Sequence, residues 1–489
     1  MSHFSWIDGG IVGVYLVATM IAGLSVRKYV GKVEHFLIAG REMDVYLGIA
    51  SLAATEFGIV TCMSAAQLGY ENGFAGATVG ILYGLAMFVV GYTGFCIKPL
   101  RDSGVVTIAE LFEKRFGPRI RWWSGVVIVL GGLLNMGIFL RQGGEFLVLV
   151  CGLSTGRLEI TMTVLLIGVA IYTIAGGMLS VLVTDYLQFI VMSVGMLAVT
   201  FMMLANVSWD TLVNTVREHY GDGGFNPFVN PRLGWSYVVF NGLLNLAVAC
   251  TWQTTIARLL SAKDTKTGQR VYTATSFFFV CQFLIPGIWG IAALATLEPG
   301  VITANNTTHA MPIYLSMSVP VGLMGLLVAG MLAADMSTDS SYMLTWGSVI
   351  YNDLLAPFRK TRWSEKRGLR WNRAIIALIG VFLLFYGLWY EIRDGVWTYL
   401  TVTATIYLSS MSTLLVACCY WPRANSWGAA GAILVGALFP TMYLVLQQLA
   451  ATRELATWIG PNYSGIAAFV GAAAAMIVGS LLKPHPRNS

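Results

Sequence analysis

The sequence predicts an all-α polytopic membrane protein with about thirteen transmembrane helices, and three observations support this fold class. Only 11% of the 489 residues are charged, whereas about 25% are charged in an average soluble domain. Hydrophobic residues make up 56% of the chain, and the mean hydropathy is +0.70. Apolar runs of about 20 residues, the length that crosses a bilayer, recur from one end to the other. Soluble enzymes, nucleic-acid-binding proteins and secreted scaffolds are therefore excluded.

The predicted spans follow one another with short polar connections. Each is an apolar run long enough to form a helix through the bilayer. In chain order they cover residues 6–26, 44–70, 76–97, 122–152, 158–175, 181–205, 233–256, 272–297, 315–347, 374–391, 395–419, 427–450 and 463–482. The pair Gly176-Gly177 separates the fifth span from the sixth. The first run has no basic segment before it and no small-residue cleavage site, so we expect a retained helix and not a signal peptide.

The distribution of Lys and Arg predicts the orientation in the membrane. With the amino terminus outside, twenty-four of the 30 Lys and Arg residues fall at inner connections and five at outer ones. Arg258 is counted with the inner group, and Arg141 lies within a span. Positive charge concentrates on the cytoplasmic side of membrane proteins. We therefore expect a multi-pass protein of the plasma (inner) membrane, with its amino terminus outside and its carboxyl terminus in the cytoplasm.

The connections leave no room for an appended soluble module. The longest polar stretches are the outer loop near 206–232 and the inner loop near 350–373, and no GxxxxGK[ST] phosphate loop occurs. We predict a single transporter domain over residues 1–489, with the lipid bilayer as its surroundings. The protein is not expected to be an enzyme, to bind nucleic acid or to need an obligate protein partner.

Six charged side chains lie at least four residues inside the ends of the predicted spans. Each costs about 2.5–3.5 kcal/mol on insertion scales, so each is a candidate functional group. They are Glu56, Arg141, Glu145, Asp185, Asp335 and Asp339. Arg141 and Glu145 are four residues apart and can pair on one helix; alternatively, Arg141 contacts a substrate carboxylate. Asp335 and Asp339 are also four apart, and we expect them near the inner end of the ninth span, where water or a cation of an inner loop satisfies them.

Two spans together predict an ion site. The adjacent hydroxyls of Ser337 and Thr338, with the carbonyl of Ala334 one turn earlier, present three oxygens in a small arc. Na⁺ prefers such hard oxygen ligands. The second span contains SLAATEFGIVTCMS, whose helix is predicted to be weak around Glu56 and Gly58. Free carbonyls at an unwound segment can coordinate an ion near the midplane of the bilayer.

The depths of these segments are compatible with one site. At 1.5 Å per residue, Ala54 and Phe57 lie ~15–20 Å from the inner end of their span. Ser337 lies ~30 Å from the outer end of its long span, and Asp185 lies ~6 Å from the inner end of the sixth span. All of them fall between the midplane and the inner face.

Four stretches of the chain resemble the sodium:solute symporter family, which includes carriers of glucose, proline, pantothenate, sialic acid and choline. They are SLAATEFGIVTCMSAAQLGYENG, VTIAELFEKRFGPRIR, IAGGMLSVLVTDYLQ and AGMLAADMSTDSSYML, and ARLLSAKD is a weaker fifth match. They follow the family order over nearly the whole chain. The resemblance implies a LeuT-like fold, in which two inverted repeats of five helices cover residues 44–205 and 233–450 and the second and seventh spans are broken at their centres. Residues 1–43 then form an extra first helix with its inner loop, and residues 451–489 the last helix and tail.

The resemblance also implies the ion site and the coupling ion, Na⁺. Its ligands are the backbone carbonyls of Ala54, Phe57 and Ala334 and the hydroxyls of Ser337 and Thr338. Asp185 corresponds to an aspartate that forms a second sodium site in some members. Glu56 stands where proline carriers have an aspartate, and it is expected to tune the site or the coupling through its charge or a hydrogen bond.

Substrate identity does not transfer from the family. Sugar carriers have a Glu-Gln pair where this chain has Val60-Thr61, and the position near the carboxylate-binding arginine of sialic acid carriers is Asn135. The candidate substrate residues are polar or aromatic groups on the spans that line the family's cavity. They are Thr61, Gln67, Asn135, Arg141, Asn241, Asn245, Trp252 and Gln253. Hydrogen bonding between helices is the alternative role for each.

These observations together predict a sodium-coupled symporter that imports a small organic solute by alternating access. Arg141 and Glu145 favour a carboxylate or an amino acid over a sugar. A proton-coupled symporter of the same fold, with Glu56 and Asp185 carrying protons, stays open. A transport-deficient solute sensor and a passive channel are further alternatives.

Overall fold

The computed structural model describes residues 4–303, 306–359, 363–390 and 395–483, and no strand occurs within these ranges beyond one isolated bridge between Met43 and Ala262. The α-helices follow the apolar runs of the sequence. They are α1 Trp6–Ser25, α2 Val33–Ile38, α3 Val45–Glu56, α4 Ile59–Asn72, α5 Thr78–Thr93, α6 Ile97–Asp102, α7 Ile108–Phe116, α8 Pro118–Met136, α9 Phe139–Val150, α10 Leu158–Asn206, α11 Trp209–Tyr220, α12 Gly234–Thr251, α13 Gln253–Ser261, α14 Thr265–Thr296, α15 Ala310–Ser318, α16 Leu323–Val349, α17 Glu365–Trp389, α18 Val396–Tyr420, α19 Ser426–Gln448, α20 Arg453–Ile459 and α21 Pro461–Leu482.

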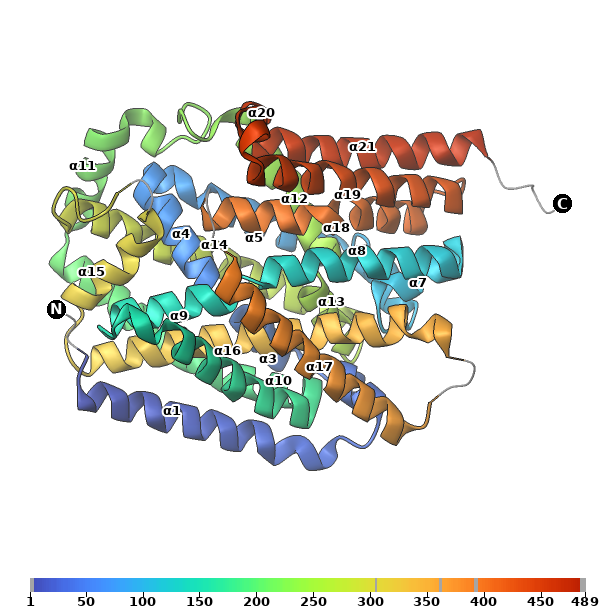
Figure 1. Ribbon diagram of the computed structural model, residues 1–489, viewed down its shortest axis with the longest axis horizontal. Helices are drawn as coiled ribbons and strands as arrows, with labels where there is room; N and C mark the ends of the chain where they lie inside the picture. Colours follow the sequence, from blue (N-terminus) through green and yellow to red (C-terminus); the bar gives the residue numbers. More distant parts are fainter. Residues whose placement is uncertain (1–3, 304–305, 360–362, 391–394, 484–489) are drawn as a thin grey trace.

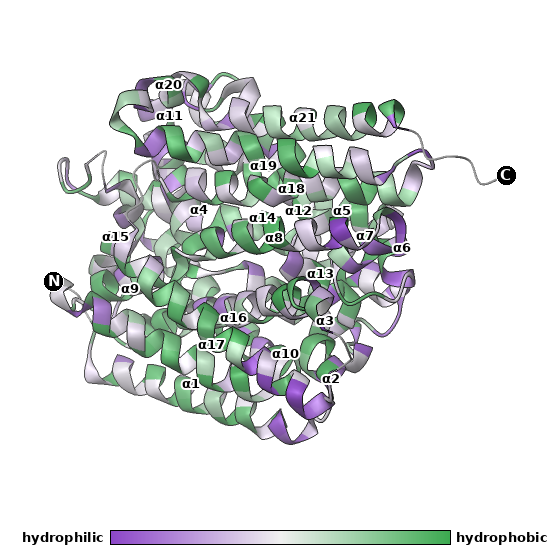
Figure 2. Ribbon diagram, turned by 45° about the vertical axis from the view of Figure 1, so that its right-hand side comes forward, coloured by the Kyte–Doolittle hydropathy of each residue, from purple (hydrophilic) through white to green (hydrophobic). Residues whose placement is uncertain are grey.

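The long helices lie side by side along the longest axis of the molecule, with α1 beginning at one end and α21 ending at the other (Figure 1). Their ribbons are largely hydrophobic along the bundle, and hydrophilic residues gather at the end that carries α6 and α7 (Figure 2). Within the described residues, nine helical segments are long and apolar enough to cross a membrane. The chain is therefore a multi-pass membrane protein, and the count of thirteen spans stays a prediction. Four of the cations counted for the orientation, Lys360, Arg362, Arg393 and Arg487, lie outside the described residues.

Two transmembrane segments are interrupted near their centres, as the resemblance implied. Between α3 and α4 the chain leaves helical geometry at Phe57 (φ −94°, ψ 48°) and Gly58 (ψ 163°). Between α12 and α13 it does so at Trp252 (φ −66°, ψ 121°). A helix end leaves its last carbonyls and first N–H groups without partners inside the helix. Each break therefore exposes backbone polar groups in the middle of the bundle.

A glycine joins the predicted fifth and sixth spans. They form one element, α10, whose only non-helical residue is Gly177 (φ 55°, ψ −143°). A Cβ atom at this position would lie 2.5 Å from the carbonyl oxygen of Phe36. Only glycine accommodates both this positive φ and this close approach. The predicted link at Gly176-Gly177 is therefore a sharp kink and not a loop.

The ninth predicted span, 315–347, was placed too early. Residues 310–318 form the separate helix α15, and α16 begins at Leu323, directly after Gly322 with φ 86°. The apolar run continues through both helices, so composition alone does not reveal the turn between them. At 1.5 Å per residue, Ser337 consequently lies ~21 Å from the start of its helix, whereas the predicted span placed it at ~30 Å. Its hydroxyl is closer to the centre of the bundle than we expected.

Glycines let α4 and α14 pack with their backbones in direct contact. A Cβ atom at Gly69 would lie 2.2 Å from the carbonyl oxygen of Gly287, and one at Gly290 would lie 1.9 Å from that of Ala66. Small residues at a membrane helix interface permit this close approach, which replaces hydrophobic driving force with van der Waals contact. The pairing holds α4, which begins directly after the first break, against α14.

We expect Gly290→Ala to destabilise the protein, because the added methyl group must push α14 away from the carbonyl of Ala66. The free energy of unfolding should fall by about 1–3 kcal/mol, as overpacked interfaces do. Thermal unfolding of the purified protein in detergent measures the effect. Gly168→Ala on α10 is the matched control, since no atom lies within 4 Å of a Cβ atom there. Equal melting temperatures for the two variants would contradict the packing argument.

Candidate functional site

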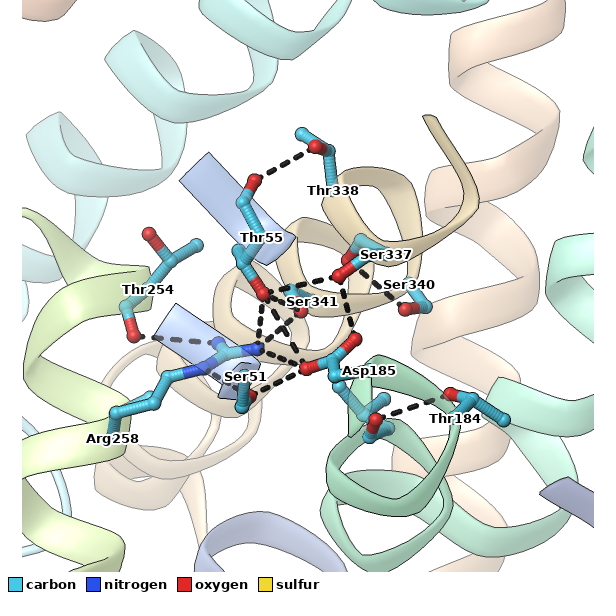
Figure 3. A network of polar contacts seen from close by, with 12 residues as sticks. Ser51, Thr55, Thr184, Asp185, Thr254, Arg258, Ser337, Thr338, Ser340 and Ser341 are labelled. Atoms are coloured by element: carbon cyan, nitrogen blue, oxygen red, sulfur yellow. Dashed lines mark hydrogen bonds and ion pairs between the residues drawn. The ribbon is translucent and has the colours of Figure 1, made fainter. Parts of the chain in front are cut away.

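The first helix break lies against the hydroxyl-bearing turn of α16. The Thr338 Oγ1 hydroxyl donates to the carbonyl of Thr55 at 2.7 Å and lies 2.9 Å from the carbonyl oxygen of Ala334 (Figure 3). A Cβ atom at Gly58 would lie 2.7 Å from Thr338 Oγ1, so the missing side chain lets α16 approach. The structure thus brings together the two segments that the sequence predicted to form an ion site.

The carbonyls at the end of α3 are the other half of this site. Thr55 accepts from Thr338, and the Glu56 carbonyl accepts from the Gln282 amide on α14. Ala54 and Phe57, the predicted carbonyl ligands, precede and follow these two residues and are buried. Because α3 ends at Glu56, its last carbonyls have no partner inside the helix. Oxygen atoms are therefore concentrated at the break.

Asp185 of α10 lies directly beside the hydroxyl turn. Its Oδ1 accepts from Ser337 at 2.6 Å, and its Oδ2 accepts from Ser51 on α3 at 2.5 Å. All three side chains are fully buried. Ser337, a predicted ion ligand, is thus held by the carboxylate that the sequence proposed for a second site.

Arg258 is the clearest departure from the sequence-based expectation. It was assigned to an inner connection, but its side chain is fully buried, and Nη2 lies 3.1 Å from Asp185 Oδ2. The same nitrogen donates to Thr55 Oγ1 at 2.6 Å and to Ser341 Oγ at 2.5 Å (Figure 3). The predicted span ended at residue 256, whereas α13 continues to Ser261 and turns its last arginine inward. A buried carboxylate requires such a partner, because unpaired charges in a low-dielectric interior are costly.

Glu56 connects the two broken helices. Its Oε1 accepts from the hydroxyls of Thr254 at 2.5 Å and Thr255 at 3.3 Å, both in the first turn of α13. Its backbone carbonyl receives Gln282, and its side chain also borders the central cavity. A single residue therefore contacts both breaks and the space between them.

The central cavity is small, with a volume of about 90 Å³. Four predicted substrate residues line it: Thr61, Asn135, Asn245 and Trp252. The other lining residues are Glu56, Tyr83, Phe139, Leu244, Val248, Gln282, Phe283, Tyr342, Trp397, Leu400, Thr401 and Ala404. The aromatic members were missed because an aromatic residue in an apolar run does not reveal whether it faces lipid or a cavity.

The remaining predicted substrate residues lie elsewhere. Gln67 and Asn241 line a neighbouring cavity, which shares Trp397 and Thr401 with the central one. Arg141 and Gln253 are not among the residues lining either cavity in the described part of the chain.

Arg141 has partners of its own. Its Nε donates to Glu145 Oε1 at 3.0 Å, and Nη1 donates to the carbonyl of Tyr390 at 3.2 Å. The predicted pairing of Arg141 with Glu145 is therefore present. Its guanidinium is committed to protein groups outside both cavities.

Asp335 and Asp339 are not placed as expected. Both are buried, and a Cβ atom at Gly143 on α9 would lie 2.9 Å from Asp335 Oδ2. Within the described residues, that oxygen and both carboxylate oxygens of Asp339 have no hydrogen-bond partner. In the described part of the chain, neither carboxylate lies within ion-pair distance of a cation, so the expected inner-loop partner is not found.

Comparison with known proteins places this geometry in context. Residues 36–436 match the model of the sodium:solute symporter family. The chain is 27% identical over 479 residues to sodium/glucose cotransporter 4 of Danio rerio, covering 90% of this chain and 72% of that protein. It is 25% identical over 425 residues to the high-affinity choline transporter 1 of Torpedo marmorata, covering 83% and 69%. A Na⁺-coupled sialic acid symporter, solved in a substrate-bound outward-open state, shares its fold, with a TM-score of 0.83 at 17% identity and coverage of 99% and 100%.

We expect Arg258→Met to lower the free energy of unfolding by about 3–5 kcal/mol, because it leaves the Asp185 carboxylate buried without its cation. The double variant Asp185→Asn/Arg258→Met should recover most of this loss, since neither charge is then unpaired. Arg141→Met is the control, because its pair with Glu145 is partly exposed and should contribute less. Thermal unfolding measures these three variants and the single variant Asp185→Asn. If the double variant loses the sum of the two single losses, the charges do not depend on each other.

Proposed function

Because the chain belongs to the sodium:solute symporter family, whose coupling ion is Na⁺, we propose that it is a sodium-coupled symporter that carries a small organic solute by alternating access. The supporting observation is the contact between the break after α3 and the hydroxyl turn of α16. An ion whose ligands come from both segments binds only while they lie together. Its binding therefore favours that conformation over one in which they separate.

The proposed Na⁺ ligands are the carbonyls of Ala54, Phe57 and Ala334 and the hydroxyls of Ser337 and Thr338. The donor set fits a hard monovalent cation, because all five groups are oxygens and none is a carboxylate. The Thr338 hydroxyl now donates to Thr55 and lies near Ala334. A hydroxyl oxygen keeps its lone pairs while its hydrogen is donated, so it can face a cation at the same time. Gly58 leaves space at this position.

We further propose that one Na⁺ accompanies each solute. The guanidinium of Arg258 already compensates Asp185 at 3.1 Å. A second Na⁺ at Asp185 would place two positive charges against one carboxylate where the interaction is weakly screened. In this proposal Asp185 acts in coupling, by positioning Ser337, and Glu56 does so by linking α3 to α13.

The orientation proposed is amino terminus outside and carboxyl terminus in the cytoplasm of the plasma (inner) membrane. Inward movement of one charge then gains about 2.3 kcal/mol per 100 mV of inside-negative potential, equivalent to a roughly fifty-fold solute gradient. The two repeats, 44–205 and 233–450, are the proposed moving units, with 1–43 and 451–489 outside them. The protein is thus proposed to be a carrier and not an enzyme.

The expected preference for a carboxylate or an amino acid rested on Arg141. That guanidinium pairs with Glu145 and donates to the Tyr390 carbonyl, away from both cavities. The geometry therefore gives the preference no support. The coarser proposal, a small organic solute, depends on the cavity alone.

Uptake into proteoliposomes tests the proposed function. Purified full-length protein should accumulate a solute from a chemically mixed panel under an inward Na⁺ gradient, and not when K⁺ replaces Na⁺. Its Na⁺ dependence should have a Hill coefficient of about one. Accumulation driven by a proton gradient alone, and lost in Glu56→Gln, would favour proton coupling instead. Saturable solute binding without uptake would favour a sensor. Equilibration of the solute across the membrane without accumulation would favour a channel.

We expect Thr338→Ala to raise the Na⁺ concentration for half-maximal uptake at least about tenfold, which corresponds to about 1.4 kcal/mol of lost ion binding. Thr338→Ser keeps the hydroxyl and should restore near-normal Na⁺ dependence. Thr345→Ala is the matched control, because Thr345 is a buried hydroxyl of the same helix that bonds only within its own turns. Unchanged Na⁺ dependence in Thr338→Ala would contradict the proposed ion site.

A further inference from the structure

Aromatic rings form much of the wall of the central cavity. They come from five different helices and from the break at Trp252, and they are Tyr83, Phe139, Trp252, Phe283, Tyr342 and Trp397. Tyr342 contacts both Phe139 and Trp252, with ring centroids 5.1 and 5.7 Å apart. Phe283 and Trp397 meet edge to face at 5.2 Å. The face of an aromatic ring carries negative charge density, so several rings around one space attract a cation.

The amides of the cavity offer hydrogen-bond acceptors. The side-chain nitrogens of Asn135 and Asn245 each donate to a backbone carbonyl at 2.8 Å, that of Leu400 and of Asn241 respectively. The Gln282 nitrogen donates to the carbonyl of Glu56. Each of these partners can only accept, so the amide nitrogen must be the atom that faces it. The oxygen is therefore the atom that each amide can turn toward a solute.

The described lining of the cavity has one acidic side chain. Among the described residues that line it, Glu56 is the only charged one, and none is Lys, Arg or His. No described cation lies within ion-pair distance of Glu56, and Arg258 pairs with Asp185 instead. Hydroxyls of Thr254 and Thr255 hold Oε1. A buried carboxylate without a counter-ion is costly, and a positively charged solute removes that cost.

We propose that the transported solute is a small organic cation, an ammonium group that packs against the rings of Trp252 and Tyr342 and is balanced by Glu56. This inference rests on the proposed function and names the solute class of the same cavity. A carboxylate or phosphate solute would be repelled by Glu56 and would find no basic side chain among the lining residues. A neutral solute would leave Glu56 uncompensated.

Two further groups of the cavity indicate which chemical group the solute carries beside its ammonium. The Tyr83 hydroxyl and the Trp397 Nε1 are buried hydrogen-bond donors without a partner in the described part of the chain. Both line the cavity, so each can donate to one oxygen atom of a solute. An ammonium that also carries a hydroxyl group satisfies the rings, the acceptors and these donors together. Choline is therefore a suitable probe.

Three molecules of nearly the same shape test the inference. Choline is positive, 3,3-dimethyl-1-butanol is its neutral carbon analogue, and 3,3-dimethylbutyrate is the corresponding carboxylate. Binding to purified full-length protein in Na⁺ is measured by calorimetry or by competition. We expect choline to bind at least about tenfold more tightly than the neutral analogue, a ratio within reach of a desolvated cation–π and charge interaction. The carboxylate should bind least. Equal affinity for choline and the alcohol, or no binding of choline, overturns the inference.

Variants of the lining residues test whether the cavity causes the preference for choline over the neutral alcohol. Glu56→Gln and Trp252→Leu should each reduce the ratio of choline to alcohol affinity toward one, whereas Tyr342→Phe keeps its ring and should keep most of it. Trp209→Leu is the control, because Trp209 is half-exposed on α11 and outside the cavity. Each variant is first checked for an unchanged melting temperature, and the conservative pair Glu56→Gln and Tyr342→Phe suffices if Trp252→Leu does not fold. An unaltered ratio in Glu56→Gln contradicts the role of its charge.

The same experiments separate this inference from the proposed function. Sodium-driven uptake of D-glucose or the carboxylate, without uptake of choline, would support the proposed symporter and contradict the inference that its solute is a cation. Tight choline binding that is identical in Na⁺ and K⁺ would support the inference of a cationic solute and contradict sodium coupling.

Discussion

The buried ion pair between Asp185 and Arg258 is the interaction on which the arrangement of the core depends. It joins α10 to α13, and the same guanidinium and carboxylate bind hydroxyls of α3 and α16. In a membrane interior neither charge can turn to water, so each fixes the other, and the hydroxyls that surround them saturate the remaining hydrogen-bonding positions. Four helices are thereby held in one register. The hydroxyl turn of α16 faces the break after α3 because this network holds it there.

The two helix breaks supply free backbone groups beside the Asp185–Arg258 pair. An intact helix would use its carbonyls internally, but the breaks at Phe57-Gly58 and Trp252 free backbone groups. Glu56 touches both sides, through its carboxylate to α13 and through its carbonyl to α14. The proposed ion site and the central cavity are therefore adjacent, because Glu56 lines the cavity and stands between the proposed ligands Ala54 and Phe57 in the chain. Coupling between them needs no long pathway.

Much of the fold was predictable from the sequence, because apolar length, glycine and clustered hydroxyls are local signals. The weak helix around Glu56 and Gly58 and the pairing of Arg141 with Glu145 are present. The predicted link at Gly176-Gly177 is instead a kink within one helix. The start of α16 was missed, since the apolar run does not change at Gly322. Arg258 was misplaced because its burial depends on the direction α13 takes after Trp252. Tertiary packing sets the direction of α13. It also decides whether the side chains of Tyr83 and Trp397 face lipid or the cavity.

The central cavity shares part of its wall with the neighbouring cavity. Trp397 and Thr401 also line the neighbouring cavity, which extends to Gln67 and Arg232 at the end of the bundle where α4 finishes. The side chains of Trp397 and Thr401 therefore separate the two spaces, and a molecule longer than the central cavity fits only if they move apart. We expect such a molecule to keep the chain from closing around it. Elongated analogues of a solute are then expected to bind without crossing the membrane, and to act as blockers.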